Sequence, residues 1–329
     1  MHKYTRIIIV LLVGCFTALP VLAHDDTASL VKSSVLHIKA LQSQQMKILK
    51  SQQKEISELK LDVAKVKEDI ERPPVNEIAE ILKRGKLTVV MYAKDTPPFY
   101  FMDKNNVLSG LDVVLITGFA DLLGVPVEFD RSAKTLDEVV YKIEHHQGDI
   151  GISKLSATFT RSTKVLFSDP YINLKQSLLI NRLELAKQLQ GRPQEEVIQH
   201  LTGKIGVVAK SSYLGYAKHF HEMEVIENPS WDSIIEDART GKITAAFRDD
   251  AEIKKILHDK PDVALSLLSV VLTDAEDPKA IAVAFDNRKV KDLLDVYIKS
   301  LDLKLSADKI INDYDNVVQT IQSKIKQSL

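Results

Sequence analysis

The segment LDEVVYKIEHHQGDIGISKLSATFTRSTKVLFSDPYI, residues 136–172, decides how the body of the chain folds. Its first part, 136–146, predicts a helix, and residues 148–153 predict a short strand that runs into a polar loop. A helix that leads into a strand with polar residues at its end is typical of an α/β sheet.

The same alternation continues on both sides of this segment. We expect helices at 76–83, 111–123, 136–146, 213–221, 230–240 and 252–258, and strands at 87–92, 125–129, 148–153, 204–208, 224–226 and 245–247. Strands that alternate with helices predict parallel sheets covered on both faces. About 250 residues of this pattern fit two α/β lobes better than one large sheet. Ligands of such sheets bind at the carboxyl ends of the strands.

Residues 28–71 predict a coiled coil. From Ala28 to Ile70 the sequence holds neither glycine nor proline, and a heptad register fits throughout. The a positions are Ala28, Val35, Gln42, Leu49, Ile56, Val63 and Ile70, and the d positions are Val31, Ile38, Gln45, Gln52, Leu59 and Val66. Ten of these thirteen are apolar, and the seam is narrow and flanked by Lys and Glu. The alternative is an amphipathic helix packed on its own domain, which usually has a wider apolar stripe.

The core glutamines of this stalk predict a fixed register at some cost in stability. Both dimer and trimer remain open, because β-branched residues occupy a and d positions alike. The stalk is expected to end at Arg72-Pro73-Pro74, since proline cannot continue a helix. Residues 72–75 are therefore interpreted as a linker.

The first residues predict export. Met1–Arg6 is basic, Ile7–Ala18 is apolar but short for a membrane span, and Val21-Leu22-Ala23 suits a cleavage site. We expect a signal peptide at 1–23, cleaved after Ala23, and a periplasmic protein. The alternative is a lipobox at residues 12–15 that leaves Cys15 lipidated.

Composition excludes several function classes. The net charge is −1 and no basic block stands out, so nucleic acid is not an expected partner. Cys15 is the single cysteine, which rules out a disulfide framework in the mature chain. The paired histidines at 145–146 and 219–221 lack metal-ligand spacing. We expect neither a metal nor a cofactor.

Four stretches of the body carry a family resemblance. They are LTVVMYAKDTPPFYFMDKNNVLSGLDVVLI (87–116), GDIGISKLSATFTRSTKVLFSDPYI (148–172), GKIGVVAKSSYLGYA (203–217) and GKITAAFRDD (241–250). The chain resembles the type II periplasmic solute-binding proteins of family 3, which serve polar amino acids. The second stretch is the most specific.

This resemblance implies a two-lobed α/β fold with a hinge. The long coiled-coil helix that the heptads predict precedes this fold and lies outside the resemblance. We expect a solute-binding domain at 76–314, with lobe 1 at 76–178 and 274–314 and lobe 2 at 179–273. The hinge would lie near 177–180 and 271–273, and residues 315–329 would form a C-terminal helix.

The resemblance also implies which residues bind a zwitterionic amino acid. Arg161 occupies the position of the carboxylate-binding arginine, where its planar fork suits bidentate contact. Ser153 and Ser156 would supply donors from the same loop, and Asp249 matches the ammonium-binding acid. Alternatives without a role in ligand binding are that Arg161 is a surface arginine paired with an acid and that Asp249 is a solvated loop carboxylate.

Further candidates are expected around this pair. Ser211 and Ser212 precede a predicted helix, whose first N–H groups favour anions, although a serine there can simply cap the helix. Thr96 and Leu136 fall at family contact positions.

Lys154 and Tyr92 complete the predicted binding residues. Lys154 stands where a small or hydroxylated residue is common, and it would either pair with an acidic ligand or point to solvent. Tyr92 lies close in sequence to further aromatic residues. The chain also departs from the family at Thr96, where an aromatic ring often stacks on the ligand, and at Ala93, where binders of basic amino acids often have an acid. Together with Lys154, these departures disfavour a cationic ligand and mildly favour an acidic or neutral one.

The predicted function is capture of a small amino acid or related carboxylate for a membrane permease. An ABC-type permease is favoured, although another transporter is possible. The stalk predicts a homo-oligomer. An alternative is a ligand-sensing module for a membrane partner, and a third is an enzyme resembling cyclohexadienyl dehydratase, with Glu252 near its catalytic glutamate. We expect no enzymatic activity, because nothing else marks an acid–base pair and a glutamate that opens a helix also suits the macrodipole.

Overall fold

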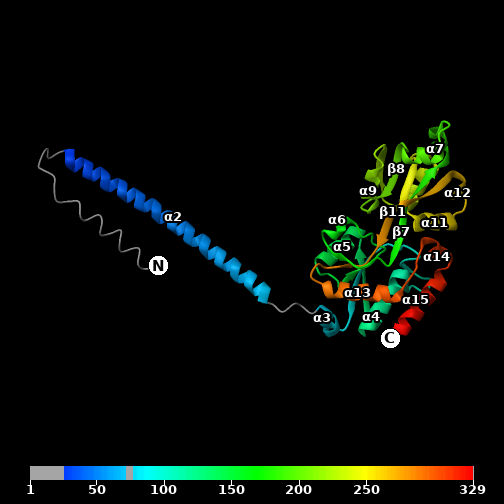
Figure 1. The fold of residues 1–329 in the computed structure, drawn as a ribbon, viewed down its shortest axis with the longest axis horizontal. Helices are drawn as coiled ribbons and strands as arrows, with labels where there is room; N and C mark the ends of the chain where they lie inside the picture. The colour runs from blue at the N-terminus through cyan, green and yellow to red at the C-terminus, as the bar shows by residue number, and fades with distance from the viewer. Residues whose placement is uncertain (1–25, 72–76, 329) are drawn as a thin grey trace. The chain divides into compact units, whose positions relative to one another are not determined.

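The structure is a computed structural model that describes residues 26–71 and 77–328 (Figure 1). The chain divides into two compact units, residues 1–75 and 76–329. The predicted signal peptide at 1–23, Cys15 and the predicted linker at 72–75 lie outside the described residues.

The first unit contains the long helix α2, Asp26–Glu71. Its 46 residues give a length of about 70 Å at 1.5 Å per residue. The helix that the sequence predicted is confirmed. Its apolar seam is solvent-exposed in the single chain, with Leu49 56% and Ile56 52% exposed. Whether this seam pairs with another helix stays a prediction.

The first lobe of the second unit is built on a five-stranded sheet in the order β4-β1-β5-β12-β6. Its strands are β1 (Leu87–Tyr92), β4 (Val127–Ala133), β5 (Ile150–Gly151), β6 (Leu166–Phe167) and β12 (Ala282–Val283). Its helices are α3 (Glu77–Arg84), α4 (Leu111–Leu123), α5 (Leu136–Glu144), α6 (Phe159–Ser162), α13 (Arg288–Leu301), α14 (Ala307–Asn312) and α15 (Tyr314–Ser328). A small hairpin adds β2 (Phe101–Met102) and β3 (Leu108–Ser109).

The core of this lobe lies between the sheet and α4, α13 and α15. Leu115, Ile116 and Phe119 on α4 pack with Tyr297 on α13 and Ile321 on α15, and all are almost fully buried. The α4 helix ends at Gly124, whose φ of 69° is a left-handed conformation that glycine adopts without strain. The chain then turns directly into β4.

The second lobe is built on a sheet in the order β11-β7-β10-β8-β9. Its strands are β7 (Ile172–Asn181), β8 (Gly203–Val208), β9 (Met223–Asn228), β10 (Ala245–Asp249) and β11 (Leu267–Lys279). Its helices are α7 (Arg182–Leu189), α8 (Gln194–Gln199), α9 (Tyr213–Tyr216), α10 (Trp231–Arg239), α11 (Asp250–Asp259) and α12 (Val263–Ser266), and a 3₁₀ turn, η1 (Ala217–His219), follows α9. Two apolar clusters, one on each side of this sheet, form its core.

Both sheets are mixed, which corrects the expectation of parallel sheets. In the first lobe β12 runs antiparallel to β5 and β6, and in the second lobe β7 runs antiparallel to β10 and β11. The reason is the chain path. One strand, β7, leads from the first lobe into the second, and β11 leads back, so the two must run in opposite directions.

Strands β7 and β11 lie side by side between the lobes (Figure 1). Their pairing shifts register between Val271 and Glu276. The predicted hinge segments, 177–180 and 271–273, and the predicted lobe boundaries all lie within these two strands. The predicted α/β fold with two lobes and a long N-terminal helix is confirmed.

Candidate ligand-binding site

A cavity of about 500 Å³ lies between the two lobes. The first lobe contributes the loop after β1, the start of α5 and the loop after β5, while the second contributes the loops after β8 and β9 and the junction of β10 with α11. These segments follow the carboxyl ends of strands, which is where ligands of α/β sheets bind.

Nine of the ten predicted binding residues line this cavity. They are Tyr92, Thr96, Leu136, Ser153, Lys154, Ser156, Ser211, Ser212 and Asp249. The tenth, Arg161, is not among the lining residues.

Arg161 makes its contacts within the first lobe. It lies on the single turn α6, which Thr158 caps by accepting the Arg161 backbone N–H at 3.3 Å. Its guanidinium is buried and donates to Asp137 Oδ1 from Nε at 3.1 Å and from Nη2 at 2.9 Å. Nη1 donates to the Ser156 carbonyl at 3.2 Å. The acid partner that the sequence left open for this arginine is therefore Asp137, at the start of α5.

Lys154 joins the lobes. Its backbone N–H donates to Asp112 Oδ2 at 2.7 Å, and its side chain extends from the first lobe to the second. There Nζ lies 3.0 Å from Asp249 Oδ1 and 2.6 Å from Glu252 Oε1. The Lys154 side chain is only 5% exposed, and Nζ lies 4.7 Å from the centre of the Phe99 ring. Lys154 was expected to pair with an acidic ligand or to point to solvent. It pairs with acids, but these are Asp249 and Glu252 of the protein itself.

Asp249 caps helix α11 and lies between two lysines. Its Oδ1 accepts the Glu252 backbone N–H at 3.1 Å, which is the role of an N-cap. Burial raises the pKa of Asp249, but Lys154, Lys279 and Arg248 outweigh burial and lower this pKa to about 2. The same balance, with Arg248 and Lys154 as the main cations, lowers the pKa of Glu252. Both carboxyl groups are therefore ionised at neutral pH.

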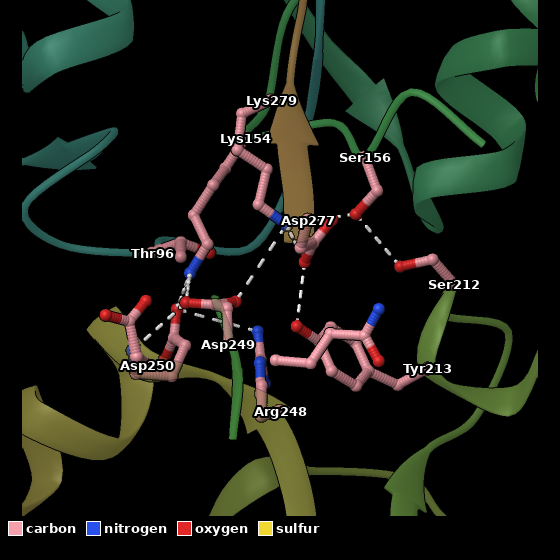
Figure 2. Close-up of polar contacts among 12 residues, drawn as sticks. Thr96, Lys154, Ser156, Ser212, Tyr213, Arg248, Asp249, Asp250, Asp277 and Lys279 are labelled. Carbon is pink, nitrogen blue, oxygen red and sulfur yellow. Dashed lines mark hydrogen bonds and ion pairs between the residues drawn. The ribbon is translucent and has the colours of Figure 1, made fainter. Parts of the chain in front are cut away.

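A second set of polar contacts surrounds Lys279 on β11 (Figure 2). Its ammonium donates to Asp277 and, at 2.9 Å, to Ser156 Oγ. Ser156 Oγ in turn lies 3.0 Å from Ser212 Oγ of the other lobe. Tyr213 donates its hydroxyl to Asp277 Oδ2 at 2.7 Å. The predicted serines therefore contact each other across the cavity.

Sequence reasoning missed Lys279 and Asp277. Both are almost fully buried, Lys279 at 2% and Asp277 at 0% exposure. The pair belongs to the polar run DAEDPK at the end of β11, whose composition is unusual for a strand. These charges can be buried only because partners from distant parts of the chain neutralise them. The local sequence pattern does not reveal such partners.

The remaining predicted residues shape the cavity walls. Ser153 Oγ accepts the Tyr92 backbone N–H at 2.8 Å and so joins the loop after β5 to β1. Thr96 Oγ1 donates to Tyr100 Oη at 3.0 Å. Ser211 Oγ donates to the Val208 carbonyl at 2.6 Å and closes the turn after β8.

Ser212 precedes a helix that is shorter than predicted. The expected helix at 213–221 is α9, Tyr213–Tyr216, followed by η1. The Ser212 side chain makes no capping hydrogen bond. A single turn develops little of the dipole that favours anions at helix starts.

Basic residues outnumber acidic residues around the cavity. The lining includes Lys94, Lys134, Lys154, Lys210, Arg248, Lys255, Lys260 and Lys279, against Asp95, Asp232, Asp249, Glu252 and Asp259. Within the described residues, the side chains of Lys94, Lys134 and Lys210 make no hydrogen bond or ion pair, whereas Lys255 pairs with Asp259. Three exposed lysines without an acid partner among the described residues therefore line the cavity.

Within residues 26–71 and 77–328, no group of three or more His, Cys, Asp or Glu side chains is arranged to hold a metal ion. In the same part of the chain, no helix is long and apolar enough to cross a membrane.

Comparison with known sequences identifies the family. The profile of the bacterial extracellular solute-binding proteins, family 3, matches residues 88–316. The chain belongs to this family. The resemblance seen in its sequence motifs is thereby confirmed.

Solved structures of amino-acid-binding proteins share this family member's fold. The substrate-binding protein AbpA of Streptococcus pneumoniae, bound to L-arginine, superposes with a TM-score of 0.56 at 24% identity over 76% of this chain and 98% of that chain. The ancestral amino acid-binding protein AncCDT-1, a precursor of cyclohexadienyl dehydratase, gives a TM-score of 0.55 at 23% identity over 75% and 97%. At such identities the likeness shows the fold, and the two-lobed architecture is confirmed.

Curated relatives fall into two kinds. The ABC transporter arginine-binding protein 1 of Escherichia coli is 24% identical over 60% of this chain and 78% of its own length. The membrane-bound lytic murein transglycosylase F of Saccharophagus degradans is 26% identical over 64% of this chain and 40% of its own length. The family member therefore spans about two fifths of the transglycosylase that it matches.

These relatives overturn the expectation of a protein without enzymatic activity. Lytic murein transglycosylase F is an enzyme, and relatives of this kind from at least four organisms match the chain at 25% or 26% identity. The sequence features used for that expectation, the absence of an acid–base pair and the helix-opening position of Glu252, therefore do not suffice to set this chain apart from enzymes.

Proposed function

We propose that this family member captures a small organic carboxylate, such as a dicarboxylic acid or an acidic amino acid, between its two lobes. The cavity of about 500 Å³ carries the proposal, because it has the size of a small-molecule site and an excess of cations. The predicted preference for acidic or neutral ligands points the same way.

The unpaired lysines come from both lobes. Lys94 and Lys134 belong to the first lobe, and Lys210 follows β8 in the second. An anion that contacts lysines of both lobes binds the closed form better than the open form. This difference in affinity is the free energy that moves the population toward closure.

Delivery to a membrane permease completes the proposal. Relatives named as ABC transporter binding proteins support a permease of that type. The basic and apolar first residues support export to the periplasm. The exposed seam of α2 supports a stalk that links several copies and raises their local concentration at a partner. A sensing partner would use the same stalk.

A thermal-shift panel tests the ligand class. Succinate, glutarate, aspartate and glutamate represent the proposed class, and arginine, lysine and histidine represent the alternative. An acid present at a hundredfold excess over its Kd is expected to raise the Tm by about 5 °C or more through mass action. The proposal is wrong if a basic amino acid raises the Tm and no acid does.

Variants of the three unpaired lysines test whether these residues bind the acid. The triple variant K94A/K134A/K210A is expected to bind the acid about tenfold more weakly, because three exposed charges contribute about 0.5 kcal/mol each. The matched control K104A/K164A/K218A removes the same charge from exposed lysines that do not line the cavity. Equal losses in the two variants would show that only net charge matters.

A further inference from the structure

Six charged side chains meet where the lobes face each other across the cavity. They are the acids Asp249, Glu252 and Asp277 and the bases Lys154, Lys279 and Arg248. The acids and the bases balance in number. All six are largely withdrawn from solvent, from 0% exposure for the side chain of Asp277 to 21% for that of Arg248. Each of the three acids already has a basic partner within 4.0 Å, and one buried oxygen of the cluster, Asp277 Oδ1, makes no hydrogen bond.

Asp249 is the residue that the family resemblance assigns to a ligand's ammonium group. In this structure its Oδ1 lies 3.0 Å from Lys154 Nζ, and its Oδ2 lies 4.0 Å from Lys279 Nζ. Glu252, one turn further along α11, also contacts Lys154, at 2.6 Å. A ligand ammonium would have to enter beside two buried ammonium groups, and like charges at such distances repel strongly.

The backbone holds Lys154 in this place. Its φ is 52°, a left-handed conformation that costs a non-glycine residue free energy and persists only where the surroundings enforce it. The Lys154 N–H is bonded to the buried Asp112 carboxylate, and the Phe99 ring lies against the ammonium. The backbone of Lys154 is therefore fixed in position, and its buried ammonium group lies next to acidic side chains.

We propose that Lys154 is a built-in occupant of the ammonium subsite, so that the cavity selects carboxylates that lack an α-ammonium group over the corresponding amino acids. The choice of carboxylates rests on the proposed function, whereas the role of Lys154 rests on its contacts with Asp249 and Glu252 alone. Lys154 is in this sense a specificity-determining residue. Its ammonium also joins the lobes, as a ligand's ammonium would.

Matched ligand pairs test this inference. Succinate and aspartate differ only in the α-ammonium, as do glutarate and glutamate. Titration calorimetry on the mature full chain is expected to show that the member without the amine binds at least about tenfold more tightly in one pair or both. Tighter binding of aspartate or glutamate to the wild-type protein would overturn the proposal for Lys154 and leave anion capture intact.

Substitution of Lys154 is expected to reverse this preference. In K154G the acids Asp249 and Glu252 lose their ammonium partner, and glycine suits the left-handed φ. The amino acid of a pair should then gain at least about tenfold in affinity relative to the wild-type protein, while its partner without the amine does not. K154N is the second variant, because asparagine also tolerates this φ and its short side chain leaves the acids free. Absence of this gain in both folded variants would overturn the proposal.

Lys210 provides the matched control. It lines the same cavity and has a φ of 56°, but within the described residues its side chain has no acid partner. K210G is therefore expected to weaken both members of a pair by the same factor. If the wild-type protein binds neither member and K154G gains the amino acid, the role of Lys154 is supported and the proposed function is wrong. A gain in K210G equal to that in K154G would show that a loosened loop, and not the freed acids, admits the amine.

Discussion

The charges of Asp249 and its neighbours set how the protein responds to acid. Because the pKa of Asp249 is lowered to about 2 in the folded protein, its contribution to stability is present above the unfolded pKa of about 4 and is lost as pH falls toward 2.

The contribution of Asp112 to stability has the opposite pH dependence. Burial raises its pKa to about 7, so its contribution is fully present in acid and is lost as pH rises through that value.

The variant D249N isolates the first of these effects. At pH 7 it is expected to be about 3 kcal/mol less stable than the wild-type protein, because Lys154 and Lys279 lose a buried partner. The difference should shrink toward pH 2, where Asp249 of the wild-type protein takes up a proton. Urea unfolding at pH 7 and at the lowest pH that keeps the protein folded measures both differences, and the opposite contribution of Asp112 cancels between the two proteins.

D274N is the control for this measurement. Asp274 lies on the exposed part of β11 and is not among the residues of the charged cluster. Its substitution is expected to change stability by less than about 0.5 kcal/mol at either pH. A D249N deficit of the same size at low and neutral pH would show that Asp249 acts through its shape and not through its charge.

Residues that line the cavity could be predicted from sequence where the order of elements alone places them. Ser153 and Ser156 follow β5 and Asp249 ends β10, so the order of elements is enough to place them at the carboxyl ends of strands. The partners of Arg161 and Lys154 could not be predicted in the same way. Asp137 belongs to a different helix from Arg161, and Glu252 belongs to a different lobe from Lys154. Contacts of this kind depend on tertiary packing, which leaves no local pattern.

Elements with strong local signals were predicted well. Strand β1 and helix α4 have the expected bounds, since an apolar run marks the strand and Gly124 marks the helix end. The long strands β7 and β11 were anticipated only as chain crossings. Polar residues in both strands obscure the period-two pattern, and in the fold partners from both lobes satisfy these groups.

Helix α2 allows a prediction at the same scale. Its seam residues Leu49 and Ile56 are more than half exposed in the single chain, and apolar side chains repeated in this way favour association with another copy. By light scattering, the variant L49D/I56D is expected to be a monomer, whereas the wild-type protein is expected to be a dimer or a trimer. The control K47D/K54D adds two acids on the opposite face of the helix and should keep the wild-type mass. A monomeric wild-type protein would contradict the coiled coil.

In the whole molecule, stalk and cavity belong to separate units. Residues that line the cavity all lie between Tyr92 and Lys279, within the unit 76–329, and α2 lies within the unit 1–75. A chain without residues 24–72 is therefore expected to bind its carboxylate with a Kd within about twofold of that of the full chain. Titration calorimetry of both proteins measures this ratio, and light scattering shows whether the shortened chain has become a monomer. If association through α2 instead changed how the lobes close, the affinity of the shortened chain for its ligand would fall by much more than twofold, whereas the affinity of the control K47D/K54D would stay the same.

The same comparison separates the two roles proposed for the chain. The lobes would bind the ligand, and the stalk would set how many cavities are held together.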